Sequence, residues 1–312
     1  MHPVLLQGEG LTIERPARAT GMAVGAGISA VALILSLALL LRAMDWPASF
    51  PQFLAYSGAA LMAAVGIAFA FWTYACARLG YAVATNEMVI RWGPVSHRLP
   101  LTSIKAITQG RGEQRPRISG IGWLGYHVGR GEVDGLGRVL FFSTHRVPEE
   151  LVYIETADLV YAISPQDPAR FAAALEKARK GAAKGGTNAG DPVVQRSVIA
   201  AHPIWSDRTA QWLGLTAVLL NAALWGYVLA TYPDLHNEIT IEFPPIGDIT
   251  TLQSRDEILQ IPATASALLG ANLVAALVFH QKERAATYLL LSGAIFFQVV
   301  FWIAAIVAVI NA

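Results

Sequence analysis

The chain has 312 residues, of which 54% are hydrophobic and 14% are charged. Soluble globular domains carry about 25% charged residues, so this composition, with a mean hydropathy of +0.45, excludes an ordinary soluble, a disordered or a collagen-like protein. The 23 basic and 22 acidic side chains nearly cancel, and this balance argues against nucleic-acid binding. A single cysteine, Cys76, excludes an intramolecular disulfide framework and a zinc site built from several cysteines. The composition therefore indicates a membrane protein.

Two apolar runs follow a short N-terminal segment, residues 1–19. A transmembrane helix needs about 20 consecutive apolar residues, and residues 20–41 and 53–77 meet this requirement. The first run is longer than the apolar region of a signal peptide, and no small-residue cleavage site follows it. We therefore predict two uncleaved transmembrane helices within residues 20–78.

Residues 79–178 differ from the apolar runs before them. They contain short segments with β propensity, separated by turns at Gly, Pro and Asn-Glu. The predicted strands are Tyr81–Ala84, Met88–Trp92, His97–Leu99, Ile104–Thr108, Trp123–Val128, Arg138–Ser143, Leu151–Glu155 and Leu159–Ile163. A helix is predicted over Asp167–Arg179, because Phe171 and Leu175 follow helical spacing and Asp167 is placed as its N-cap. The pattern predicts an antiparallel all-β barrel or sandwich capped by one C-terminal helix.

Three segments of this region carry a family resemblance: YAVATNEMVIRWGPVSHRLPLTSIKAI, RISGIGWLGYHVGR with residues 140–144, and YAISPQDPARFAAAL. In the last of them, Tyr161 to Leu175, an aromatic residue, Ile-Ser-Pro, Asp-Pro, Phe and Leu follow one another. Residues 79–178 thus resemble the bacterial pleckstrin-homology (PH) domain family. The resemblance implies a PH-like fold and leaves the function open, because folds of this kind host many binding roles.

The C-terminal half returns to membrane character. Residues 179–208 are predicted as a flexible linker rich in Gly, Ala and Lys, followed by an interfacial helix over residues 193–207. Three apolar runs then predict three more transmembrane helices, within residues 209–312. They are residues 209–230, 261–279 and 285–310, with an acidic loop at 231–260 between the first two. The fold class is a multi-domain membrane protein with a five-helix α transmembrane region and a PH-like domain.

Lysine and arginine in the short flanking segments predict the orientation, because cytoplasmic loops are enriched in them. The segment 78–208 holds seventeen basic and twelve acidic side chains, whereas the loop 231–260 holds one arginine and six acids. The N-terminus and the PH-like domain are therefore predicted in the cytoplasm, and the C-terminus outside, in the bacterial inner membrane.

A weaker resemblance covers residues 231–262. It rests on Tyr232-Pro233, the strand-like Ile239–Phe243, Gly247, Arg255 and Ile261-Pro262. These residues are similar to a short membrane-protein signature of unknown function, which often carries His where this chain has Glu242.

Arg111, Arg115 and Arg117 lie in a glycine-rich loop and form the candidate site for phosphate or an anionic lipid headgroup. The alternative is a solvated basic loop. The nearby Gly120-x-Gly122-x-x-Gly125 pattern lacks the strand–turn–helix context of a dinucleotide site. We predict that it forms a turn and the start of a strand.

The membrane runs contain no Asp, Glu, Lys, Arg or His, which argues against an ion-coupled pump. Their strongest polar groups are Asn221, Asn272 and Gln298, and these are predicted to form hydrogen bonds between helices. Gly21 and Gly25 form a Gly-x-x-x-Gly pattern, which favours close helix packing or self-association.

No His, Cys or carboxylate spacing indicates a catalytic or metal site. We therefore predict that the protein has no catalytic residues and binds no metal or cofactor. We predict a non-enzymatic scaffold, regulator or accessory subunit that contacts the bilayer and other membrane-protein subunits or itself. The alternative is a transporter or lipid-handling protein with a cavity near the three amides. An enzyme would need a cluster of outer-loop residues, namely Asp234, His236, Glu238, Glu242 and Asp248.

Overall fold

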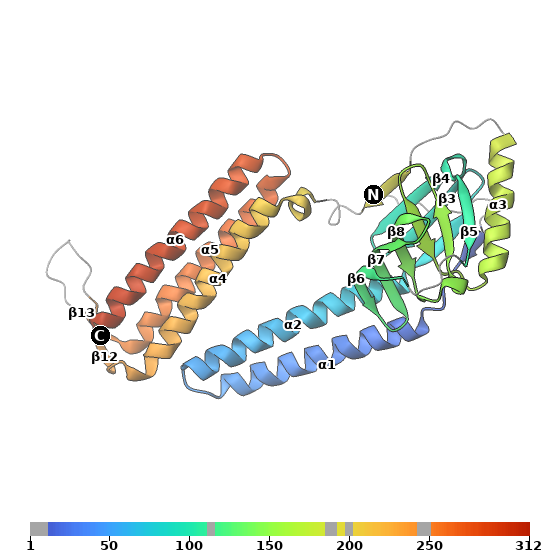
Figure 1. Ribbon diagram of the computed structural model, residues 1–312. Coiled ribbons are helices and arrows are strands. Elements are labelled where there is room, and N and C mark those ends of the chain that lie inside the picture. Colours follow the sequence, from blue (N-terminus) through green and yellow to red (C-terminus); the bar gives the residue numbers. More distant parts are fainter. Residues whose placement is uncertain (1–11, 111–115, 185–191, 197–201, 242–250) are drawn as a thin grey trace. The chain divides into compact units, whose positions relative to one another are not determined.

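The computed structural model describes residues 12–110, 116–184, 192–196, 202–241 and 251–312. The chain divides into two compact units. The first unit comprises residues 1–33 and 64–200, and the second comprises residues 34–63 and 201–312 (Figure 1).

Within the described ranges, five helices are long and apolar enough to cross a membrane, as the sequence predicts. They are α1 (Ala19–Met44), α2 (Phe50–Ala77), α4 (Arg208–Thr231), α5 (Gln260–His280) and α6 (Arg284–Ile310). Many of their Leu, Ile, Val and Phe side chains are exposed in the isolated chain, which is the arrangement expected of lipid-facing helices. The protein is a multi-pass membrane protein.

Helices α1 and α2 form an antiparallel hairpin joined by small polar residues. Ser29 Oγ donates to the carbonyl of Gly66 at 2.8 Å, and Ser36 Oγ donates to the carbonyl of Ala59 at 2.7 Å. Hydroxyl-to-carbonyl bonds of this kind, together with small residues, let two apolar helices approach closely in lipid.

Two sheets form the β-rich domain. The first has the order β1-β2-β3-β4-β11, and the second has the order β5-β9-β10-β8-β7-β6. The first sheet contains β1 (Thr12–Glu14), β2 (Gly80–Val83), β3 (Glu87–Trp92), β4 (Val95–Pro100) and β11 (Val193–Arg196). The second contains β5 (Ala106–Gln109), β6 (Ile118–Trp123), β7 (Tyr126–Val133), β8 (Gly137–Ser143), β9 (Val152–Glu155) and β10 (Val160–Ile163). Short 3-10 turns occur at Leu101–Ser103 and Pro148–Glu150.

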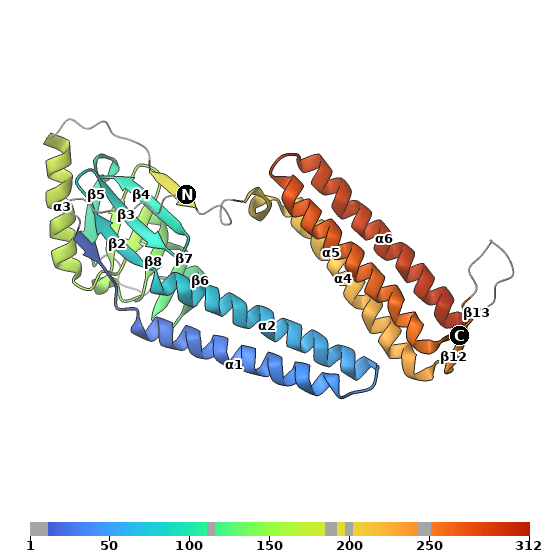
Figure 2. The same ribbon diagram turned by 180° about the vertical axis from the view of Figure 1, so that it is seen from behind.

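The two sheets and α3 (Pro168–Lys184) share one core. Tyr81 of the first sheet donates its hydroxyl to the carbonyl of Phe142 in the second at 2.7 Å. Phe171 and Leu175 of α3 are buried in the same core, and α3 contacts β5 and the turn at 101–103 (Figures 1 and 2). Among the described residues the strands form two separate sheets and no closed barrel, so the sandwich alternative describes the domain.

Several strand predictions need correction. The predicted strand Trp123–Val128 contains the turn between β6 and β7, because Gly125, whose positive φ permits the turn, lies within it. The predicted interfacial helix is wrong at its start, where Val193 to Arg196 pair with β4 as strand β11; residues 197–201 lie outside the described ranges. The pair β8–β10 is parallel, because β10 lies between β9 and β8 instead of following a simple meander.

Helices α4, α5 and α6 form a three-helix bundle in the second unit, so three helices follow α3. A short 3-10 turn, Pro203–Ser206, precedes α4, and another, Tyr232–Asp234, follows it. The antiparallel pair β12 (Glu238–Ile241) and β13 (Thr251–Ser254), followed by the turn Arg255–Leu259, lies between α4 and α5.

Candidate functional site

The hairpin of β6 and β7 turns at Leu124 and Gly125, between the paired residues Trp123 and Tyr126. Gly125 has a φ of +82°, a left-handed conformation that glycine adopts without strain. Gly120 and Gly122 of the Gly-x-Gly-x-x-Gly pattern lie in strand β6, and Gly125 lies in the turn before β7. The predicted turn and following strand are present, a strand also precedes the turn, and α1 is an element that the turn contacts.

The tip of the hairpin packs on the first two turns of α1. Trp123 Nε1 donates a hydrogen bond to the carbonyl of Gly21 at 2.8 Å. A Cβ atom at Gly21 would overlap the carbonyl of Gly125, and one at Gly25 would lie 2.9 Å from the Trp123 ring. Gly25 also faces the Thr73 hydroxyl of α2, so the glycine pair admits both the neighbouring helix and the β hairpin.

The ends of α1 and α2 continue the core of the β-rich domain. Cys76 is buried within that core, and Met22 and Trp72 pack against it. The Arg18 guanidinium donates to the carbonyls of Ala77 and Leu79, where α2 ends and the first sheet begins. Backbone hydrogen bonds and core side chains thus both join the domain to the ends of α1 and α2.

This two-sheet domain with one helix in its core corresponds to the predicted PH-like segment. Residues 79–179 match the family model of the bacterial PH domain. The match confirms the resemblance and covers about a third of the chain. Searches among curated proteins and among solved structures give no match.

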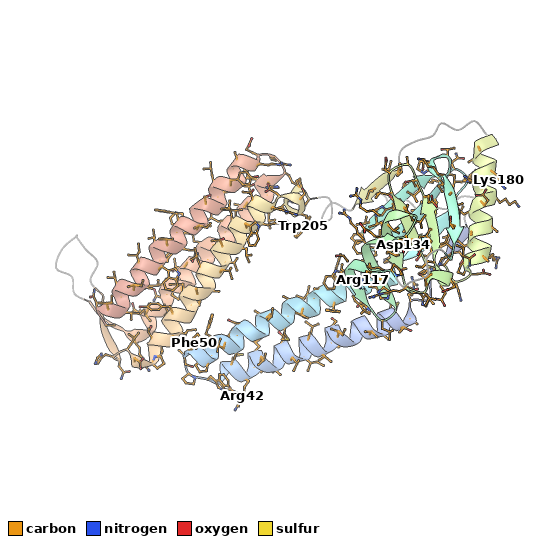
Figure 3. The ribbon with its side chains drawn as sticks, viewed as in Figure 1. Arg42, Phe50, Arg117, Asp134, Lys180 and Trp205 are labelled. Atoms are coloured by element: carbon orange, nitrogen blue, oxygen red, sulfur yellow. The ribbon has the colours of Figure 1, made fainter. Side chains whose placement is uncertain are left out.

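The predicted arginine site lies at the start of β6 of the PH domain. Arg117 is exposed to solvent directly before β6 (Figure 3). Arg111 and Arg115 lie outside the described residues, so the proposed three-arginine site stays a prediction.

Two of the three predicted membrane amides meet in the α4–α6 bundle. Asn221 Nδ2 donates to Gln298 Oε1 at 3.2 Å, and Gln298 Nε2 donates to the carbonyl of Ala265 at 3.1 Å. Ser266 Oγ donates to Asn221 Oδ1 at 3.0 Å, so this network joins all three helices. Asn272 instead bonds to the carbonyl of Leu268 in its own helix.

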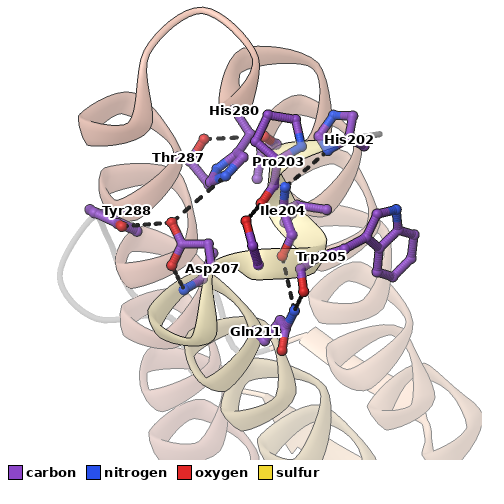
Figure 4. Close-up of polar contacts among 12 residues, drawn as sticks. His202, Pro203, Ile204, Trp205, Asp207, Gln211, His280, Thr287 and Tyr288 are labelled. Atoms are coloured by element: carbon purple, nitrogen blue, oxygen red, sulfur yellow. Dashed lines mark hydrogen bonds and ion pairs between the residues drawn. The ribbon is translucent and has the colours of Figure 1, made fainter. Parts of the chain in front are cut away.

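A second polar cluster, centred on Asp207, lies at the end of the bundle where α4 begins (Figure 4). Asp207 Oδ1 accepts from the backbone N–H of Ala210 at 3.0 Å and so caps α4. Its Oδ2 accepts from the Tyr288 hydroxyl at 2.7 Å and lies 3.7 Å from His280 Nε2. The carboxylate therefore connects the start of α4 with α5 and α6.

His280 is 2% exposed, and neither of its ring nitrogens has a hydrogen-bond partner among the described residues. The ring of His202 stacks on it with centroids 6.0 Å apart. Hydrogen bonds from the Ala210 N–H and then from the Tyr288 hydroxyl lower the pKa of Asp207. A lowered carboxyl pKa contributes stability above the unfolded-state pKa and loses it as the pH falls through the folded value.

Sequence reasoning missed the Asp207 cluster and the hairpin contact with α1. A signal for the cluster was available, because the predicted turn between α5 and α6 places His280 on the same membrane side as Asp207. The hairpin contact had only an indirect signal: a glycine pair in a membrane helix and a glycine-rich turn elsewhere.

Proposed function

We propose that the protein is a non-enzymatic membrane scaffold or accessory subunit that presents its PH domain to a partner subunit. One observation carries the proposal: the PH domain shares its core and its backbone hydrogen bonds with the ends of α1 and α2. A binding surface held in one orientation loses less freedom on association than a tethered one. This arrangement suits a docking platform at the membrane surface.

A second contact surface is the segment between α4 and α5. The Tyr232 hydroxyl donates to the Asp256 carboxylate, and the Arg255 guanidinium lies 4.9 Å from the centre of the Tyr232 ring. These contacts join the two ends of the segment to each other. By the positive-inside rule, this acidic surface is extracytoplasmic and the PH domain is cytoplasmic.

The membrane amides join helices, as the proposal requires, although Asn221 also lines a cavity of about 470 Å³ that the transport alternative would use. Asn221 and Gln298 both have protein hydrogen-bond partners, and such pairing is the ordinary way in which helices join in lipid.

The test is chemical cross-linking in native membranes, followed by purification of the full-length chain. A defined partner subunit or a defined homo-oligomer is expected with the wild-type chain. The yield of the cross-linked complex should fall with Gly125→Val, because a valine side chain there would push the hairpin away from α1. The same yield should persist with Gly135→Val, because the turn at Gly135 has open space around it. Recovery of a solitary monomer from wild-type membranes would contradict the proposal.

A further inference from the structure

A cavity of about 470 Å³ lies between the first half of α2 and the second half of α4. Ala48, in the loop before α2, and Leu259, in the turn before α5, complete its wall. Cavities of a few hundred Å³ are the usual size of small-ligand sites. All of these segments belong to the second compact unit.

Direct contacts join the start of α2 to α4 beside the cavity. Ala48 packs against the buried cluster that contains Leu224 and Val228 of α4. A Cβ atom at Gly226 would lie 3.1 Å from the Phe53 ring of α2, so this ring packs over the glycine. The cavity therefore lies beside packed side chains of both helices.

The polar groups that line the cavity are all uncharged. They belong to Gln52, Tyr56, Ser57, Asn221 and Trp225. Among the residues that the structure describes, no Asp, Glu, Lys, Arg or His lines the cavity. A charged ligand group would lose its hydration there without gaining an opposite charge. The lining therefore favours an uncharged ligand.

Two hydrogen-bond donors of the lining have capacity for a ligand. The side-chain amide of Asn221 has two N–H groups, of which one donates to Gln298 Oε1, while Oδ1 accepts from Ser266 Oγ. Its other N–H has no hydrogen-bond partner within the described ranges, and the same is true of the Tyr56 hydroxyl there. These donors match a ligand that carries acceptor oxygens, such as carbonyl groups.

The aromatic side chains of the lining favour a flat ring as the uncharged body of the ligand. Phe53 and Tyr56 come from α2 and Trp225 comes from α4. Trp225 Nε1 donates to Ser266 Oγ at 2.9 Å, so the indole is held by the same network that holds Asn221. Aromatic rings attract one another in offset or edge-to-face arrangements beyond the gain from buried area.

The cavity lies at the depth of the lipid chains. At a rise of 1.5 Å per residue, Asn221 is about 15 Å from the end of α4 at Thr231, and Tyr56 is about 9 Å from the start of α2 at Phe50. The hydrocarbon core is about 30 Å thick, so both groups lie within it. A ligand that reaches them from the bilayer has to be soluble in lipid.

We propose that this cavity binds the ring of a quinone, an uncharged membrane lipid whose ring carries carbonyl oxygens. The Tyr56 hydroxyl and the second N–H of Asn221 donate to these oxygens, and Phe53 and Trp225 contact the ring. The proposal concerns binding and includes no electron transfer. It does not rest on the accessory role proposed above.

A quinone accounts for the lining better than a phospholipid does. The phosphate of a phospholipid would find no opposite charge in the cavity, as the lining shows. An acyl chain alone would cover the donors of Tyr56 and Asn221 without accepting a hydrogen bond from them, which costs free energy.

The experiment uses the full-length chain in phosphatidylcholine nanodiscs, to which decylubiquinone or, separately, decylbenzene is added. Decylbenzene has the same alkyl chain and an aromatic ring, but no carbonyl group. The bound ligand is measured over a titration by native mass spectrometry of the protein released from the discs.

Each of the two test variants has a matched control on the same helix. Tyr56→Phe removes one donor, and Ala222→Leu places a larger side chain in the cavity. Their controls are Tyr74→Phe, at a tyrosine of α2 that is 47% exposed, and Ala223→Leu, at an exposed alanine of α4. Neither control position lines the cavity.

The wild-type chain and both controls are expected to bind decylubiquinone equally. Tyr56→Phe is expected to bind it about fivefold more weakly, as loss of one neutral hydrogen bond predicts, and Ala222→Leu is expected to lose it. Equal binding by the wild type and both test variants, or no binding by the wild type, would overturn the proposal. Equal affinity of the wild type for decylbenzene and decylubiquinone would overturn the assignment to a quinone.

Discussion

Two features of Gly125 each require glycine: its backbone conformation and its close approach to α1. Its φ of +82° is left-handed, and a Cβ atom there would meet the backbone of Gly21. The left-handed conformation alone costs a non-glycine residue about 1–2 kcal/mol. We expect Gly125→Ala to lose more stability than this, measured by tryptophan fluorescence during thermal unfolding of the full-length chain in detergent.

The matched control for this substitution is Gly135→Ala. Gly135 has a φ of +75° but no atom within 4 Å of an added Cβ, so it carries only the conformational cost. Equal losses in the two variants would show that the contact between the hairpin and α1 contributes nothing to stability.

His127 makes the stability of the PH domain depend on pH. Because its folded-state pKa is lowered to about 4 from 6.5, the unfolded chain binds more protons than the folded one between these values. Stability therefore falls as the pH drops from about 6.5 to about 4. His127→Gln retains an acceptor for the hydrogen bond from Arg146 Nε without titrating, so we expect a smaller loss over this range in thermal unfolding, and equal slopes for both chains would refute the assignment.

At the scale of elements, the amide network of α4, α5 and α6 should behave as a unit. Gln298 is 1% exposed, so Asn221→Leu alone leaves a buried amide oxygen without its donor, a loss that costs about 1–3 kcal/mol. The double variant Asn221→Leu with Gln298→Leu removes both groups and should be closer to wild type in thermal unfolding. Additive losses would contradict a coupled network.

The membrane helices could be predicted from the sequence because the bilayer demands one long, uncharged run for each. The predicted run 20–41 lies within the observed α1, Ala19–Met44. Most strands of the PH domain were also predictable, since Gly and Pro separate them. Strand β11 was not: Val193 and Val194 have β propensity, but their pairing with β4 depends on an edge about 95 residues earlier in the chain.

The candidate sites were harder to predict, because they too depend on contacts between residues far apart in the sequence. The link between Asn221 and Gln298 follows from the cost of an unpaired amide in lipid, although the sequence does not indicate which amides pair. The contact between the β6–β7 hairpin and α1 depends on a hairpin folding back onto a helix more than 100 residues earlier, and local sequence patterns carry no information about such a contact.

At the scale of the whole molecule, the distribution of charge predicts the orientation of the chain. In a Cys76→Ala background, we expect a membrane-impermeant maleimide added to intact cells to label Ser254→Cys but not Lys282→Cys. Both positions are exposed, and they lie at opposite ends of α5. The reverse pattern would place the PH domain outside the cytoplasm.

The fixed attachment of the PH domain to α1 and α2 is the central claim, because the proposed role depends on it. Spin labels at Gly27→Cys on α1 and Asp134→Cys in the β7–β8 turn (Figure 3), again in a Cys76→Ala background, report on this attachment by pulsed electron–electron double resonance. A single narrow distance distribution in nanodiscs is the predicted result. A broad distribution in the otherwise wild-type chain would show a tethered domain and contradict the account.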